Sequence, residues 1–273
     1  MISVVALTDT FGKMFYTGGM DTFRLWHDDD GCTFHAETNV YFSQCGKDRQ
    51  LSLHELLKIT SDIAVEDYRE RGLSREVLLE HNLAILVSRC AFRFHRLPRE
   101  NEHITVTTWE EPPEALQLRR AYRITAADGT PLVSGMSTWL LVNPVSRRII
   151  PTKQFTLRTP PAAAREHDCL EPGKIIVPDD CRRLGGRTVG WSDLDANGHT
   201  NNSRYGAFLE DALPEAYREK AFTDFRINYS KEAVLGQELS VWGHFDDAAG
   251  RILLKGATES GPSFEGELLY RPD

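Results

Sequence analysis

This chain of 273 residues carries a weak internal repeat, in which a helix-like segment is followed by several strand-like segments, twice over. Phe92–Phe94 lies 135 positions before Ile227–Tyr229, whereas Tyr41–Ser43 precedes Gly190–Ser192 by 149 positions. The 14 additional residues of the first copy fall after its helix, where Gly72–His81 predicts an added loop or helix. A duplication restricts the chain to folds that two similar halves can build together.

The first predicted helix, Leu51–Tyr68, has one apolar face. Leu53, Leu56, Leu57, Thr60, Ile63 and Ala64 recur at steps of three and four residues. The second predicted helix is Asn202–Leu213. The segments with strand character are Leu83–Arg96, His103–Glu110, Leu116–Ala126 and Pro131–Asn143 in the first half, and Thr223–Ser230, Glu238–Phe245, Arg251–Glu259 and Ser263–Tyr270 in the second. We therefore predict an α+β fold with two antiparallel sheets, each wrapped around a central helix.

The pattern divides the chain into four parts. Residues 1–30 show no clear periodicity and are expected to be an extension of uncertain order and uncertain true start. Residues 31–151 form the first repeat, and residues 188–273 form the second. The proline-rich stretch 152–187, with few strand signals, is expected to be a linker.

The composition excludes several classes of protein. A net charge of −8 and a pI of about 5.6 argue against nucleic-acid binding, although a local basic patch could still meet an acidic partner. Five scattered cysteines without a CxxC pair are typical of a reducing compartment, so we expect a cytoplasmic protein. We see no signal peptide or membrane span, and we expect no cofactor and no metal.

The stretch Trp191–Asn202 carries the strongest chemical signal. Asp195, Asn197 and His199 occupy alternate positions, which share one side of an extended run, directly before the second predicted helix. A carboxylate, an amide and an imidazole at a helix N-terminus suit hydrolysis at a carbonyl, where negative charge develops. The same residues are also common in turns and caps, and a lone histidine often has only a core or surface role.

The chain resembles the acyl-acyl-carrier-protein (acyl-ACP) thioesterases, the plant FatA/FatB family and its bacterial relatives. The most specific match is Trp191–Tyr205, which is close to the family motif WSDLDxNxHxNNxxY. Supporting matches are Asn82–Arg89, Val106–Trp109, Ser137–Asn143 with Arg147-Arg148, and Tyr229–Ala233. The resemblance implies a tandem double hotdog, and a catalytic set made of Asp195, Asn197, His199 and Glu232.

The resemblance also implies an acid–base route. The family commonly has cysteine after the glutamate, but this chain has Ala233, so no thiol is available there. We expect a partly shielded Glu232 to activate water with His199. Asn197 and backbone N–H groups near residues 201–203 would polarise the carbonyl. Asp195 would orient a neighbouring donor, although its attack as a nucleophile stays open.

The first repeat provides an internal control. At the corresponding offsets, Asp195, Asn197 and His199 fall on Gly46, Asp48 and Gln50. Glu232 falls on Leu97. The second repeat is therefore expected to be catalytic and the first to shape the acyl pocket. The family resemblance implies that this pocket lies near the helix at 51–68 and the strand at 83–87.

The implied reaction releases a fatty acid from an acidic acyl carrier protein and so terminates fatty acid synthesis. Basic residues suit such a partner, and the basic pairs are Arg119-Arg120, Arg147-Arg148 and Arg182-Arg183, each of which could equally be a solvated surface pair. A hotdog thioesterase acting on acyl-CoA or releasing a polyketide is the alternative, and a non-catalytic acyl-binding module is another. Monomer and homodimer are both open.

Overall fold

The computed structural model describes residues 5–8, 14–17 and 23–272. Its helices are α1 (Leu53–Glu70), α2 (Arg75–Glu80), α3 (Arg204–Ala212) and α4 (Glu215–Arg218), with 3-10 helices η1 (Phe42–Gln44), η2 (Thr152–Gln154) and η3 (Trp191–Asp193). Its strands are β1 (Val5–Thr8), β2 (Met14–Thr17), β3 (Phe23–His27), β4 (Thr33–Asn39), β5 (Ala84–Phe94), β6 (His103–Glu111), β7 (Leu118–Ala126), β8 (Pro131–Val142), β9 (Arg182–Thr188), β10 (Phe222–Tyr229), β11 (Glu238–Asp246), β12 (Arg251–Thr258) and β13 (Gly261–Tyr270).

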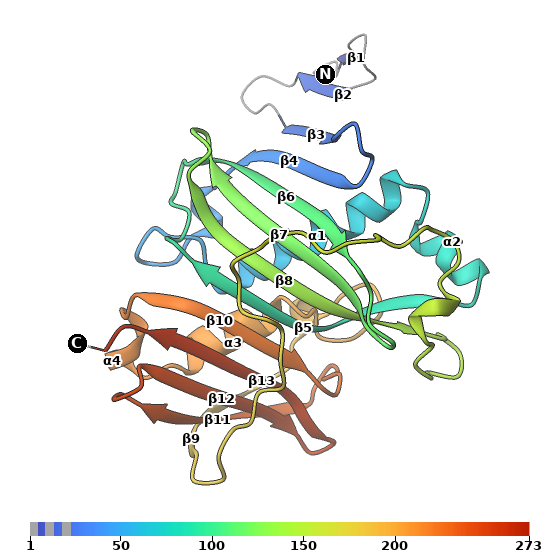
Figure 1. Cartoon of the computed structure of the whole chain (residues 1–273). Coiled ribbons are helices and arrows are strands. Elements are labelled where there is room, and N and C mark those ends of the chain that lie inside the picture. The colour runs from blue at the N-terminus through green and yellow to red at the C-terminus, as the bar shows by residue number, and fades with distance from the viewer. Residues whose placement is uncertain (1–4, 9–13, 18–22, 273) are drawn as a thin grey trace.

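The predicted α+β class is confirmed, and the two predicted sheets join edge to edge. The described strands form one antiparallel sheet in the order β1-β2-β3-β4-β6-β7-β8-β5-β10-β13-β12-β11-β9 (Figure 1). The junction is the pairing of β5 with β10, in which Phe92 lies opposite Phe225 and Cys90 opposite Ile227. The rings of Phe92 and Phe225 stack with centroids 6.4 Å apart. The two halves therefore share backbone hydrogen bonds and one core.

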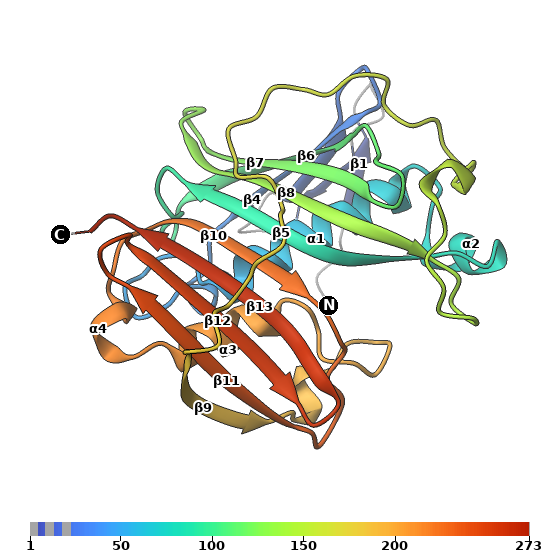
Figure 2. The same cartoon turned by 60° about the horizontal axis from the view of Figure 1, so that its bottom comes forward.

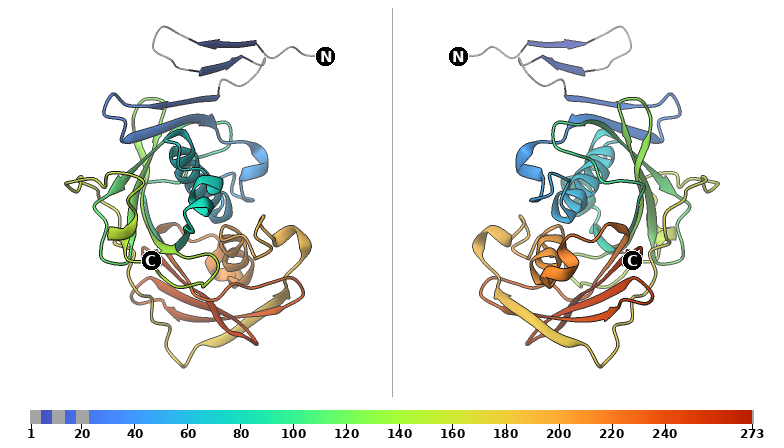
Figure 3. Two further views of the ribbon diagram at one scale, coloured as in Figure 1. Left: turned by 90° about the vertical axis from the view of Figure 1, so that its right-hand side faces the viewer. Right: turned by 90° about the vertical axis from the view of Figure 1, so that its left-hand side faces the viewer.

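The two central helices lie side by side on the concave side of the sheet (Figure 3). They approach closely because α3 carries Gly206: a methyl group there would lie only 2.8 Å from the backbone nitrogen of His54 in α1. The main core, which includes Leu56, Phe92, Phe208 and Phe225, combines both helices and both halves of the sheet. This is the tandem hotdog arrangement that the repeat predicts.

Helix α1 forms for the reasons that its sequence indicates. Ser52 caps its N-terminus by accepting a hydrogen bond from the backbone N–H of Glu55. The buried face consists of the six predicted positions together with Asp67. The helix begins at Leu53 and ends at Glu70, so its predicted ends were each two residues early.

The repeat offsets are confirmed in the hydrogen bonding. The isolated bridge Cys45↔Leu51 recurs 149 residues later as Leu194↔Thr200. The bridge Gln50↔Arg99 recurs as His199↔Val234, with the 149-residue offset on one side and the 135-residue offset on the other. The offset changes from 149 to 135 residues across the segment that contains α2. The added segment of the first copy is therefore partly helical.

Two parts of the chain contain strands that the sequence pattern did not indicate. Strand β9 lies at the end of the predicted linker, where Gly185-Gly186 conceals strand character because glycine disfavours strands. Strands β1 to β3 lie within the predicted extension, and β3 pairs with β4. Residues 1–4, 9–13 and 18–22 of that extension lie outside the described residues. The linker crosses the outer face of the sheet, opposite the helices (Figure 2).

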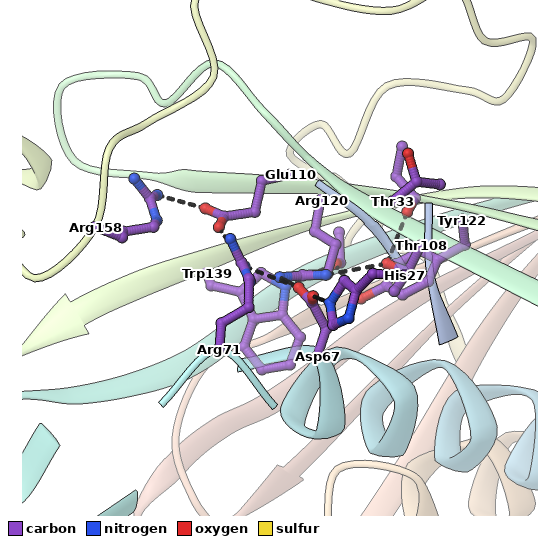
Figure 4. A network of polar contacts seen from close by, with 12 residues as sticks. His27, Thr33, Asp67, Arg71, Thr108, Glu110, Arg120, Tyr122, Trp139 and Arg158 are labelled. Atoms are coloured by element: carbon purple, nitrogen blue, oxygen red, sulfur yellow. Dashed lines mark hydrogen bonds and ion pairs between the residues drawn. The ribbon is translucent and has the colours of Figure 1, made fainter. Parts of the chain in front are cut away.

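A buried ionic network connects the C-terminal end of α1 to the sheet (Figure 4). Asp67 pairs with Arg120 at 2.7 Å, with Arg71 at 2.8 Å and with His27 at 2.9 Å. Glu110 continues the network to Arg71 at 2.6 Å and to Arg158 of the linker at 2.5 Å. Burial alone would raise the pKa of Asp67, but the two guanidinium groups and the imidazole outweigh it and lower that pKa.

Replacing Asp67 by asparagine leaves the buried guanidinium group of Arg120 without its anion, while Arg71 keeps Glu110. We expect Asp67→Asn to lower the free energy of unfolding by about 3–5 kcal/mol, the usual result of breaking a buried ion pair from one side. Urea unfolding at pH 7 measures this. Asp62→Asn on the same helix, at an exposed pair with Lys58, should change it by less than about 1 kcal/mol. If Asp67→Asn changed the free energy of unfolding as little as Asp62→Asn does, the network would add nothing to stability.

The α1–α3 contact also contains a buried acid. Glu210 of α3 accepts a hydrogen bond of 2.9 Å from the backbone N–H of Leu53, at the N-terminus of α1. Burial raises the pKa of Glu210 to about 7. The folded chain therefore holds this proton more tightly than the unfolded chain does.

A raised carboxyl pKa makes the free energy of unfolding fall as pH rises from about 4.5 to about 7. We expect Glu210→Gln, which keeps an acceptor for Leu53, to remove this decline, worth about 3 kcal/mol at most. Chemical unfolding at pH 5 and pH 8 compares the two chains. The exposed Glu219→Gln should leave the decline unchanged. A decline that persists in Glu210→Gln would assign it to other groups.

Candidate active site

The motif loop between β9 and α3 is a tight turn. It begins with η3, and Leu194 and Thr200 then form a bridge across the turn. The backbone N–H of Asp195 donates to the His199 carbonyl at 2.8 Å, and Gly198 takes a positive φ of 79°. The prediction of an extended run with Asp195, Asn197 and His199 on one side was wrong. Gly198 and the Asp195 carboxylate favour a turn, which was the alternative that these residue types also indicated.

Asp195 organises this turn. Its Oδ1 accepts hydrogen bonds from the backbone N–H groups of Asn197 at 2.8 Å and His199 at 3.4 Å. Its Oδ2 accepts from the Asn197 side-chain amide at 3.4 Å. The carboxylate therefore holds the backbone on which the other two candidate side chains are carried.

The structure brings His199 and Glu232 together. Nε2 of His199 lies 3.5 Å from Oε2 of Glu232, and both side chains are about one third exposed. The backbone positions them: the N–H of Thr200 donates to the Ala233 carbonyl at 2.8 Å, and the Thr200 hydroxyl donates to the same oxygen at 2.9 Å. The distance is long for a hydrogen bond, so the two groups form a loose contact, which is an ion pair when the imidazole is protonated.

The first repeat reaches into this site through two arginines. Nη2 of Arg147, which follows β8, lies 2.5 Å from Oε2 of Glu232. Nη2 of Arg75, on α2, donates to Oδ1 of Asn197 at 3.2 Å. The sequence presented Arg147 as part of a family match and of a basic pair that could suit an acidic carrier, but not as a partner of Glu232. Nothing in the pattern indicated Arg75, which belongs to the added segment of the first copy.

Backbone donors near residues 201–203 are mostly occupied. The N–H of Asn201 donates to the Asp193 carbonyl at 2.8 Å, and the N–H of Ser203 donates to the Asn201 side chain at 2.9 Å. Among the described residues, no hydrogen bond is formed by the N–H of Asn202. The predicted group of free N–H donors is therefore reduced to one. The Asn201 side chain closes a turn just before α3, whose N-cap is Ser203.

Two neighbouring residues are structural. Burial would raise the pKa of Asp193, but the Gly190 N–H and the guanidinium groups of Arg204 and Arg187 outweigh it and lower that pKa. Asp193 therefore anchors the loop as an ion. The Ala233 side chain is fully buried below the site, so this position offers no thiol.

The surroundings of Glu232 differ from the shielded site that a base was expected to have. The carboxylate lies in an exposed loop between β10 and β11, where it forms an ion pair with Arg147. Within the described ranges, no group of three or more His, Cys, Asp and Glu side chains could hold a metal ion. In those same ranges, no helix is long and apolar enough to cross a membrane.

Comparisons with known proteins agree with this architecture. Residues 31–154 match the acyl-ACP thioesterase N-terminal domain, and residues 183–261 match the acyl-ACP thioesterase C-terminal domain. A palmitoyl-acyl carrier protein thioesterase of Gossypium hirsutum is 27% identical over 229 residues, covering 76% of this chain and 54% of the relative. An Arabidopsis thaliana protein of the same name is 24% identical over 234 residues, covering 78% of this chain and 56% of the relative.

Solved structures share the fold. An acyl-ACP thioesterase from Bacteroides thetaiotaomicron superposes with a TM-score of 0.80 at 21% identity, covering 90% of this chain and all of that one. A 12:0-ACP thioesterase from Umbellularia californica superposes with a TM-score of 0.76 at 18% identity, covering 88% of this chain and 98% of that one. The chain spans about half the length of the curated plant relatives it matches. On both domain matches, the chain belongs to the acyl-ACP thioesterase family.

Proposed function

We propose that the chain hydrolyses the thioester of an acyl-acyl carrier protein, which yields a free fatty acid and the carrier and so terminates fatty acid synthesis. One observation carries the proposal: His199 lies beside Glu232 in the second repeat. At the same two positions the first repeat has Gln50 and Leu97, although its backbone bridges are the same. The two repeats have equivalent backbone bridges, but only the second has an imidazole and a carboxylate at these positions. This agrees with a single catalytic centre.

In this proposal Glu232 is the general base. It takes a proton from a water molecule as the water oxygen attacks the thioester carbon. The tetrahedral intermediate then expels the carrier's thiolate, which is protonated as the carboxylic acid product forms. His199, next to Glu232, shares the proton and delivers it to the leaving sulfur. No thiol of the enzyme is required, in agreement with Ala233.

The developing oxyanion needs donors. The N–H of Asn202 is the backbone candidate, and the amide of Asn197 is the side-chain candidate. Asp195 is proposed as the residue that orients Asn197, because its carboxylate accepts hydrogen bonds from the backbone N–H and from the side-chain amide of that residue. Turning the Asn197 amide from Asp195 toward substrate would require only a side-chain movement in an exposed turn.

The acyl chain is proposed to lie in the first repeat. A pocket between the first repeat and the start of the linker is lined by the apolar residues Leu83, Ile150 and Leu157 and by the polar residues His81, Asn82, Asn143, Gln154 and Thr156. Five free cysteines agree with a reducing, cytoplasmic location for the reaction. The junction of β5 and β10 supplies within one chain the partner that each half requires, so the proposal works for a monomer or a homodimer.

The test of the base is Glu232→Gln, which keeps the size of the side chain and removes its basicity. We expect kcat for acyl-carrier-protein hydrolysis to fall about 10²–10⁴-fold, the usual contribution of a positioned acid or base. Asp48→Asn is the matched control, since Asp48 holds the position of Asn197 in the first repeat, and its kcat should stay unchanged. A Glu232→Gln variant that remains folded and fully active would overturn the assignment.

The carrier is tested with acyl chains of equal length on carrier protein and on coenzyme A, over a panel of lengths. We expect kcat/KM to be higher for the carrier-protein substrates at every length. A clear preference for coenzyme A would replace the proposal with the acyl-CoA alternative. A folded chain that binds acyl groups yet hydrolyses neither thioester would instead be a binding module.

A further inference from the structure

We propose that Arg147, which the first repeat contributes, is a positioning residue for the catalytic carboxylate of Glu232 in the second repeat. This inference rests on the proposed function. It adds a residue outside the set Asp195, Asn197, His199 and Glu232, and it makes the active centre composite. Three features support it: the loop that holds Arg147, its contact with Oε2 of Glu232, and the Oε1 of the same carboxylate, to which no described residue donates.

The loop that carries Arg147 is well defined. After β8, the side chain of Asn143 accepts hydrogen bonds from the backbone N–H groups of Val145 at 3.0 Å and Ser146 at 2.8 Å. The backbone of Asn143 binds both arms of the loop, accepting from Arg147 at 2.8 Å and donating to Arg148 at 2.9 Å. Arg147 itself has φ of 56°, in the left-handed region. The backbone therefore fixes the direction from which the guanidinium reaches the second repeat.

Arg147 and His199 meet the same oxygen of Glu232. Oε2 lies 2.5 Å from Nη2 of Arg147 and 3.5 Å from Nε2 of His199. In the described part of the chain, no hydrogen bond or ion pair reaches Oε1. The two contacts hold the position of Oε2 and leave Oε1 without a donor among the described residues, so a water molecule can approach Oε1. Lys231, the adjacent cation, is turned away and donates to the Ser260 carbonyl.

Stability alone gives little reason for this pair. The Arg147 side chain is 67% exposed, and exposed ion pairs contribute about 0–1 kcal/mol. The first repeat has a comparable pair in Arg49 and Glu100, at 2.6 Å, with Arg49 at φ of 62° and a side chain 74% exposed. That pair lies within the repeat without the catalytic set, so it is a control with a similar contact distance, a similarly exposed arginine and the same left-handed arginine backbone.

The experiment compares Arg147→Ala, Arg147→Lys and Arg49→Ala. The substrates are an acyl carrier protein and an N-acetylcysteamine thioester with the same acyl chain, which lacks the carrier. We expect Arg147→Ala to lower kcat about tenfold on both substrates, a fraction of what the base contributes. Arg147→Lys should restore part of kcat, and Arg49→Ala should match wild type.

Each other outcome overturns the inference. If Arg147→Ala raises KM for the carrier protein alone and leaves the small thioester unaffected, Arg147 is a carrier-docking residue. If Arg49→Ala loses as much activity, the effect is one of general stability, which urea unfolding of the same variants would show. The proposed function is judged separately, because Glu232→Gln must impair both substrates whatever Arg147 does.

Discussion

The pairing of β5 with β10 is the constraint on which the rest of this structure depends. Each hotdog half has an open sheet edge, and unpaired backbone groups at such an edge favour association. The chain pairs one half with the other along Arg89–Arg93, and the rings of Phe92 and Phe225 stack across the contact. This junction places α1 beside α3, and it brings the loops of the first repeat to the motif of the second.

The two repeats have the same backbone but different roles. Equivalent bridges hold the loop before α1 and the loop before α3. The loop before α3 carries Asp195, Asn197 and His199 together, whereas the loop before α1 has no imidazole. Glu232 approaches His199 from the β10–β11 loop. In exchange, the first repeat supplies Arg147 and Arg75, which both contact second-repeat residues. Because side chains of both repeats meet at one site, the two halves must keep their relative position.

The sequence predicted the fold well where one physical pattern dominates. The buried face of α1 follows directly from its apolar spacing, and most strand ends agree within a few residues. Strand β9 was missed because its pairing with β11 outweighs the weak strand preference of Gly185 and Gly186. The family motif identified His199 and Glu232, whose proximity depends on a backbone contact between Thr200 and Ala233. The turn geometry and the contacts of Arg75 and Arg147 depend on tertiary packing, which no local pattern carries.

The central claim is that Glu232 activates water, with no covalent acyl intermediate on a carboxylate. Its most direct test is a single turnover in ¹⁸O-water with enzyme in excess, followed by mass spectrometry of the fatty acid and of the peptides containing Asp195 and Glu232. We predict label in the fatty acid and none in either carboxylate. Label in Asp195 or Glu232 would show that a carboxylate attacked the thioester as a nucleophile, and would contradict the account.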